Sequence, residues 1–198
     1  MVLATPPVKT EKLLTLADYF GLELESDRHY EVERGVLREM PTERDINLRI
    51  VSFLFAHLLQ SGISHARLRI GTEVVVESDR ATVREPDLVV LSEVLATAMD
   101  QNKRSTVMLG MPAPDLVVEV VSPGKENSDR DYRYKRSEYA VRRLGEYWII
   151  DPEREMVSVL EWVDGFYEVA EFSGDGAIAS KTFPDLKLTA QQILQAGI

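Results

Sequence analysis

Two acidic residues occupy positions where the chain is otherwise aliphatic, and together they could support metal-dependent chemistry. Glu119 lies between two valine pairs in the run Asp115 to Val121, and Asp87 comes directly before the aliphatic run Leu88 to Leu91. An ionised carboxylate among buried valines is costly unless it is protonated, paired with a cation or bound to a metal ion. If the two runs form neighbouring strands, the two carboxylates converge and offer the hard oxygen ligands that suit Mg²⁺ or Mn²⁺.

A structural interpretation of the same residues has to be weighed beside the catalytic one. Buried glutamates also form ion pairs that only stabilise a fold, so Glu119 alone leaves the two interpretations about evenly balanced. The helix expected at residues 129–144 supplies candidate cations, because Lys135 falls between two tyrosines at helical spacing. Arg136 has nearly the same geometry, and periodicity does not choose between the two. Either side chain could instead lie on a solvated helix face.

Hydrophobic spacing predicts the elements that would position these side chains. We expect helices at residues 15–20, 42–60 and 129–144 and after Thr189, with Thr42 and Asp45 capping the second of them. Strands are expected at residues 29–34, 36–40, 66–77, 83–91, 115–121, 146–150, 156–162 and 166–172. Residues 94–112 are expected to form a flexible excursion. This order of elements predicts an α/β fold with a mixed β-sheet flanked by helices.

The charge composition restricts the kinds of partner. The chain has 198 residues, of which 33 are acidic and 23 basic, and its net charge is −10. This balance argues against a protein that coats nucleic acid without specificity, because that affinity comes mainly from Lys and Arg side chains. Residues 125–143 nevertheless contain seven basic and four acidic residues, a net charge of +3. A polyanion would meet this stretch, and the expected phosphate contacts are Lys125, Arg130, Arg133 and Arg136.

The length and the apolar runs predict a single cytoplasmic domain. We expect a loose N-terminus at residues 1–12 and one domain over residues 13–198, since this length suits one buried core and is short for two. No apolar run approaches the roughly 20 residues that span a bilayer, and no signal pattern opens the sequence. The absence of cysteine excludes thiolate metal ligands and a cysteine nucleophile. A hairpin near residues 156–172 permits a homodimer without requiring one.

Six motifs, in order along the chain, resemble the Uma-two family, a family of restriction-endonuclease domains in the PD-(D/E)XK nuclease superfamily. They are residues 15–20 (TLADYF), 30–35 (YEVERG), 84–90 (REPDLVV), 114–123 (PDLVVEVVSP), the set Asp131, Lys135 and Tyr139, and residues 146–152 (EYWIIDP). The resemblance covers the chain from Leu14 to about Leu194. It implies a restriction-endonuclease-like fold with an added N-terminal helix and hairpin and an added C-terminal hairpin.

The resemblance also implies a set of site residues. Asp87 matches the aspartate of the superfamily's first strand motif, and Glu119 matches the acid of the next strand. The superfamily usually places a lysine two residues after that acid, where this chain has Val121. Lys135 matches the family's recurring lysine and is interpreted as a migrated equivalent. Glu31 matches the glutamate of the family's Tyr-Glu phrase and would complete the acidic cluster.

The implied activity is hydrolysis of DNA phosphodiester bonds with Mg²⁺ or Mn²⁺. Asp87 and Glu119 would hold the metal ion, while Lys135 would orient the attacking water or offset negative charge. Glu31 would bind the metal through water or position the nucleophile. Because Val121 replaces the usual lysine, a catalytically inactive protein that binds nucleic acid or protein is the alternative. A third interpretation is metal-dependent hydrolysis of another phosphorylated substrate.

Overall fold

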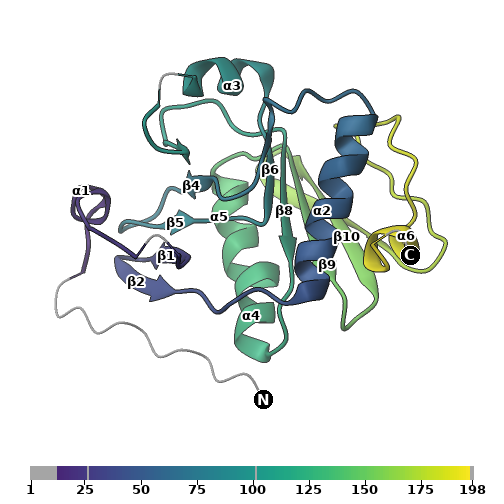
Figure 1. Ribbon diagram of the computed structural model, residues 1–198, viewed down its shortest axis with the longest axis horizontal. Helices are drawn as coiled ribbons and strands as arrows, with labels where there is room; N and C mark the ends of the chain where they lie inside the picture. Colours follow the sequence, from purple (N-terminus) through teal and green to yellow (C-terminus); the bar gives the residue numbers. More distant parts are fainter. Residues whose placement is uncertain (1–12, 26, 101, 197–198) are drawn as a thin grey trace.

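A computed structural model describes residues 13–25, 27–100 and 102–196, which form two β-sheets with flanking helices (Figure 1). The elements in chain order are α1 (Leu16–Phe20), β1 (Tyr30–Glu33), β2 (Val36–Glu39), α2 (Asp45–Gln60), β3 (Leu68–Arg69), β4 (Glu73–Val75), β5 (Val83–Arg84), β6 (Leu88–Val90), α3 (Glu93–Met99), β7 (Thr106–Val107), β8 (Leu116–Val120), α4 (Lys125–Asp129), the π-helical segment η1 (Arg130–Lys135), α5 (Arg136–Val141), β9 (Glu146–Asp151), β10 (Met156–Val163), β11 (Phe166–Phe172) and α6 (Ala190–Leu194). The expected loose terminus at residues 1–12 lies outside the described residues.

The larger sheet has six strands in the order β11-β10-β9-β8-β6-β3. Strands β8 and β9 pair in parallel and are buried along their whole length, as expected for central strands covered on both faces. Successive residues of β8 pack into different apolar clusters. Val118 belongs to the apolar cluster that includes residues of α2 and α6, whereas Val117 packs with Tyr139 of α5. Figure 1 shows α2 and the α4–α5 helix on opposite sides of β8.

The smaller sheet has five strands in the order β2-β1-β5-β4-β7. The expectation of single strands over residues 66–77 and 83–91 is wrong, because each segment divides between the two sheets as β3 and β4 and as β5 and β6. Gly71, in the left-handed region with φ +69°, lies in the first break. Pro86 lies in the second, where it has no N–H to donate to a ladder. The junction of the two sheets therefore falls just before Asp87.

The helices differ from the expectation in three places. Helix α2 begins at Asp45, and its N-cap is Arg44 without a side-chain hydrogen bond, so the predicted Thr42 cap is wrong. The expected excursion at residues 94–112 contains α3 and β7, and the former buries Leu95 and Met99. The helix expected from residue 129 begins at Lys125 and includes the π-helical turn of η1.

Other local predictions hold. A capping box of Thr15 and Asp18 opens α1, and one of Thr189 and Gln192 opens α6. The two expected hairpins form, since β1 pairs with β2 and β10 pairs with β11, each antiparallel. Within the described part of the chain, no helix is long and apolar enough to cross a membrane.

Candidate active site

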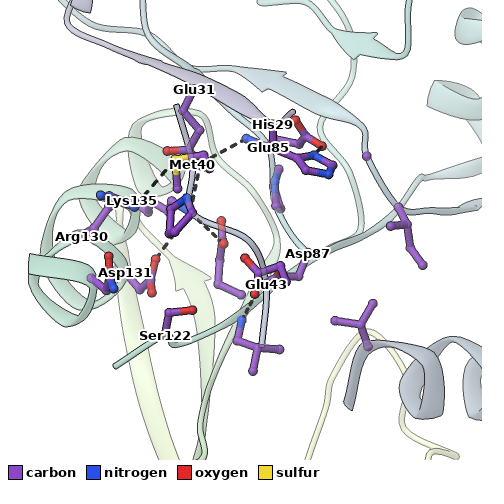
Figure 2. Close-up of a pocket in the computed structure, with 18 of the residues that line it drawn as sticks. His29, Glu31, Met40, Glu43, Glu85, Asp87, Ser122, Arg130, Asp131 and Lys135 are labelled. Carbon is purple, nitrogen blue, oxygen red and sulfur yellow. Dashed lines mark hydrogen bonds and ion pairs between the residues drawn. The ribbon is translucent and has the colours of Figure 1, made fainter. Parts of the chain in front are cut away.

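A cavity of about 190 Å³ opens where the two sheets meet η1, and we call it the acidic pocket. Figure 2 shows charged side chains from several elements pointing into it. The acidic residues of its lining come from β1, the segment before α2, the β5–β6 junction, β8 and η1: Glu31, Glu43, Glu85, Asp87, Glu119 and Asp131. Lys135 and Arg130 of η1 line the same cavity. Acidic groups therefore outnumber basic ones in this lining.

Asp87 and Glu119 enter the acidic pocket from adjacent strands. Leu88 pairs with Val118 in the antiparallel ladder of β6 and β8, and continuing this register by one residue brings Asp87 opposite Glu119, in agreement with the presence of both side chains in the cavity lining. The Val120 backbone amide donates to Asp87 Oδ2 at 2.6 Å, which ties the aspartate to the glutamate's strand. The structure thus places side by side the two carboxylates that the sequence singles out.

Lys135 lies among three carboxylates. Its Nζ donates to Glu119 Oε2 at 2.8 Å and is 3.2 Å from Glu31 Oε1 and 3.5 Å from Asp131 Oδ1. Burial alone would lower the pKa of Lys135, but the negative charges of these carboxylates outweigh burial and raise the pKa above its ordinary value. The ammonium group is consequently charged throughout the physiological pH range.

Arg136 is excluded from this position by the geometry of the helix. Its Nη2 donates to the Tyr167 carbonyl of β11 at 3.3 Å, so its side chain follows a different face from that of Lys135. The turn between the two residues joins η1 to α5, and a π-helical turn rotates the following side chains relative to a regular α-helix. Such turns are frequent at functional sites. The choice that periodicity leaves open is therefore settled in favour of Lys135.

Glu31 is held in place by Arg84, which sequence reasoning missed. Arg84 Nη1 donates to Glu31 Oε2 at 3.0 Å, while its Nε and Nη2 both donate to Glu138 at 2.8 Å. Burial would raise the pKa of Glu31, but the charges of Lys135 and Arg84 outweigh it and lower the pKa to about 2. Glu31 is thus ionised at neutral pH. An arginine inside a buried β segment was the sequence signal that could have revealed this pair.

The pKa values of Glu119 and Asp87 shift upward, in the opposite direction from the pKa of Glu31. Burial raises the pKa of Glu119 well above its ordinary value, and Lys135 only partly opposes this effect. Tyr139 Oη also donates to Glu119 Oε1 at 2.9 Å. Burial raises the pKa of Asp87 to about 7, with a further contribution from the charge of Glu43. The protein's own cations therefore do not balance the negative charge that these two acids would carry together.

The donor set fits a hard divalent cation. Carboxylate oxygens are the ligands of Mg²⁺ and Mn²⁺, and the positive charge of a bound cation would lower the raised pKa values of Asp87 and Glu119. In residues 13–25, 27–100 and 102–196, no group of three or more Asp, Glu or His side chains is arranged so that it could hold a metal ion by itself. Mg²⁺ needs no such group, because it is commonly held by one or two carboxylates with waters and substrate phosphates.

Glu43 is a further pocket residue that sequence reasoning did not assign, and Asn47 of α2 holds its carboxylate in place. Glu43 lines the cavity, and its Oε2 accepts a hydrogen bond from Asn47 Nδ2 at 2.9 Å. The same amide nitrogen lies 3.1 Å from Ser122 Oγ and so links the start of α2 to the end of β8. Only tertiary packing brings these segments together, and local sequence carries no signal of it.

The four expected phosphate contacts are dispersed. Arg130 lines the acidic pocket, and Lys125 and Arg133 are exposed on the same helical segment. Arg133 lies 3.6 Å from Asp129, and its side chain is 70% exposed. Arg136 turns toward β11, as described above. Of these four residues, Arg130 alone lines the cavity, whereas Lys125 and Arg133 are exposed to solvent elsewhere on the same helical segment.

Comparison with known proteins gives a family and a fold. The family model Uma2, described as "Putative restriction endonuclease", matches residues 16–191. No curated protein matches the chain. Among solved structures, the chain is similar to the "Crystal structure of a putative nuclease belonging to DUF820" from Anabaena variabilis ATCC 29413, with 15% identity and a TM-score of 0.70. The match covers 93% of this chain and 99% of that one, and it confirms the expected restriction-endonuclease-like α/β fold.

Proposed function

The chain belongs to the Uma2 restriction-endonuclease family, and from this premise we propose that it hydrolyses DNA phosphodiester bonds in the acidic pocket with a divalent metal ion. One observation carries the proposal. Asp87 and Glu119 face one cavity from adjacent strands, and the cations of the protein do not balance their charge. The family and the nuclease-like fold support the same reaction class.

Asp87 and Glu119 are the residues that would hold Mg²⁺ or Mn²⁺. A divalent ion bound there supplies Lewis-acid stabilisation of the phosphorane oxygens and lowers the pKa of a bound water. The hydrogen bond from the Val120 amide fixes one oxygen of Asp87 and leaves the other for a ligand. Tyr139 and Lys135 fix the two oxygens of Glu119, whose remaining lone pairs can face the cavity.

Lys135 has the role that the superfamily usually gives to a lysine two residues after the strand acid. It reaches Glu119 from η1 instead of from β8, where Val121 packs in the apolar layer. Its charged ammonium offsets negative charge at the reacting phosphate and holds Glu119 in position. Glu31, ionised and fixed by Arg84, holds Lys135 from the opposite side and can accept a hydrogen bond from the attacking water.

Cleavage assays test the proposal. Supercoiled plasmid and short oligonucleotides are incubated with the wild type in Mg²⁺, in Mn²⁺ and in EDTA, and with the variants Glu119→Gln and Asp87→Asn. We expect metal-dependent cleavage that falls by about 10²–10³-fold or more in either variant, since each loses a group that stabilises charge in the transition state. Glu73→Gln, which alters a buried carboxylate outside the pocket, is the matched control and retains activity per folded molecule.

The following outcomes would contradict the proposal. Cleavage that persists in EDTA, or that Glu119→Gln leaves intact, excludes the acidic pocket as its source. A wild type that binds DNA without cutting it in either metal favours the inactive binding protein. Metal binding without DNA cleavage would direct attention to another phosphorylated substrate.

A further inference from the structure

The acidic pocket has an apolar half that the proposed hydrolysis does not use. Its apolar lining side chains are Met40, Pro41, Leu48, Val51, Ile70, Pro86 and Val120. Leu48 of α2 is 53% exposed, and Ile70, between β3 and β4, is 58% exposed. These two aliphatic side chains thus face the cavity from separate elements while remaining open to solvent.

We propose that this apolar half holds a single nucleobase, unstacked from its strand, next to the phosphate that is cleaved. The inference rests on the proposed nuclease function and specifies its substrate. DNA that is already unpaired at the cleavage point, in a single strand or a flap, is then cut in preference to continuous duplex.

The size and the chemistry of the cavity support one base as the occupant. At about 190 Å³ the cavity is smaller than the roughly 300–1,000 Å³ of typical small-molecule sites. It therefore has room for one base and not for a stacked pair. Leu, Ile, Met and Pro are the side chains that proteins place against unstacked base steps. The carboxylates and the apolar residues line one cavity, so a phosphate at the former and its own base at the latter would occupy the same cavity.

The charges around the pocket favour the same substrate. Duplex DNA is bound mainly through Lys and Arg contacts to phosphates on both strands. Here Lys135 and Arg84 are committed to carboxylates, and the whole chain has a net charge of −10. The cations left for phosphate contacts on this helical segment are few, namely Arg130 in the cavity lining and the exposed Lys125 and Arg133. A single strand needs fewer such contacts and offers base faces that contribute binding energy of their own.

Cleavage of matched substrates tests the inference. Three labelled oligonucleotides share one sequence and present it as a single strand, as a flap and as a continuous duplex. We expect the single strand and the flap to be cut at least about tenfold faster than the duplex, because a paired base must first be unstacked and unpaired. Leu48→Ser and Ile70→Ser are each expected to reduce the rate on the single strand about tenfold, which matches the loss of one base contact.

Two control variants and a second measurement separate this site from surface effects. Leu59→Ser alters an exposed leucine of the same helix, 44% exposed, and Val94→Ser alters an exposed valine of α3; both are expected to cut like the wild type. In the non-cleaving variant Asp87→Asn, 2-aminopurine beside the scissile phosphate should change its fluorescence on binding. Adding Leu48→Ser to that variant should abolish the change.

The failures of the two proposals are distinguishable. Equal rates on the single strand and the duplex, or wild-type rates for both pocket variants, overturn the unpaired-base inference and leave the nuclease proposal standing. A wild type that cuts none of the three substrates in Mg²⁺ or Mn²⁺ overturns both.

Discussion

Two buried clusters of charged side chains differ in how their carboxylates are satisfied. In the first, which we call the Glu73 cluster, Glu73 accepts two hydrogen bonds from Arg104 and one each from Tyr19 and Thr106. In the acidic pocket, several carboxylates share Lys135, and among the residues that the structure describes Asp87 accepts a hydrogen bond from the Val120 amide and no comparable set of side-chain donors. The Glu73 cluster is complete without a ligand, whereas the pocket has negative charge left for one.

The pKa values of the carboxyl groups in the two clusters also differ. Burial would raise the pKa of Glu73, but the hydrogen bonds from Arg104, Thr106 and Tyr19 outweigh it and lower the pKa below its ordinary value. Burial prevails at Asp87 and Glu119, whose pKa values are raised. In this chain, the buried carboxylates whose charge is left uncompensated are therefore the better candidates for metal ligands.

Replacement of the cation in each cluster, Lys135 in the acidic pocket and Arg104 in the Glu73 cluster, should lower the free energy of unfolding by very different amounts. Lys135→Met leaves Glu31, Glu119 and Asp131 without their shared ammonium, and we expect it to lower the free energy of unfolding by about 3–5 kcal/mol at neutral pH. The matched change Arg104→Met leaves Glu73 with two hydroxyl donors. Because the Arg104 side chain is also 42% exposed, its loss should cost only about 1–2 kcal/mol.

Urea unfolding of the two variants measures this difference. The loss in Lys135→Met should shrink in acid, where the carboxyl groups of the pocket take up protons. Equal losses for Lys135→Met and Arg104→Met would show that both clusters are structural ion pairs of one kind.

Glu73→Gln should destabilise the protein, with a definite pH dependence. The lowered pKa of Glu73 means that its contribution is present above the unfolded value of 4.5 and is lost as the pH falls through the folded value. We expect the variant to be about 2–3 kcal/mol less stable than wild type at pH 7 and nearly equal to it in acid. Unfolding midpoints between about pH 3 and pH 8 check this slope, and a loss that is constant over that range contradicts it.

Asp87→Asn should instead raise the free energy of unfolding of the metal-free protein. Because the pKa of Asp87 is raised to about 7, the contribution of this group is complete below its ordinary value of 3.8 and is lost as the pH rises through 7. Because Asn does not ionise, the variant does not lose stability as the pH rises through this range. Relative to the wild type, the free energy of unfolding of the variant should rise between about pH 4 and pH 7 and should remain about 2 kcal/mol higher above pH 8.

Melting curves recorded in EDTA across this range measure the gain. A wild type that stays more stable than Asp87→Asn at pH 8 would show that Asp87 is a structural group like Glu73.

Glu43→Gln should produce the smallest of these effects. Glutamine preserves the shape and can still accept from Asn47, but it removes the charge that helps to raise the pKa of Asp87. Protons then compete less with the metal ion, so the pH of half-maximal cleavage should fall by a fraction of a unit and rates near pH 6 should rise a few-fold. A loss as large as that of Asp87→Asn would instead place Glu43 among the metal ligands.

The sequence predicts those parts of the molecule that depend on local patterns. The hairpins form around Arg34-Gly35 and Asp164-Gly165 because these residues adopt the left-handed conformation that the turns require. The aliphatic runs of β8 and β9 become central strands because both of their faces must be covered. Glu119 was recognisable for the same reason, since a carboxylate there contradicts the apolar pattern around it.

The features that the sequence did not predict depend on tertiary packing. The breaks at Gly71 and before Asp87 divide two strands between sheets, and hydrophobic alternation does not show where a chain changes sheet. The π-helical turn at η1 alters the helical period, so spacing could not separate Lys135 from Arg136. Glu43 and Arg84 reach the pocket only through contacts between elements remote in sequence.

Thermal unfolding with and without Mg²⁺ or Mn²⁺ tests most directly whether the acidic pocket binds a divalent ion. An ion that binds only the folded chain stabilises it by about 2.7 kcal/mol at one hundred times its dissociation constant, which should raise the melting midpoint by several degrees. We predict this rise in the wild type and in Glu73→Gln and its loss in Asp87→Asn. A midpoint that no metal moves in the wild type, or a rise that Asp87→Asn retains, would contradict the assignment of the pocket as a metal site.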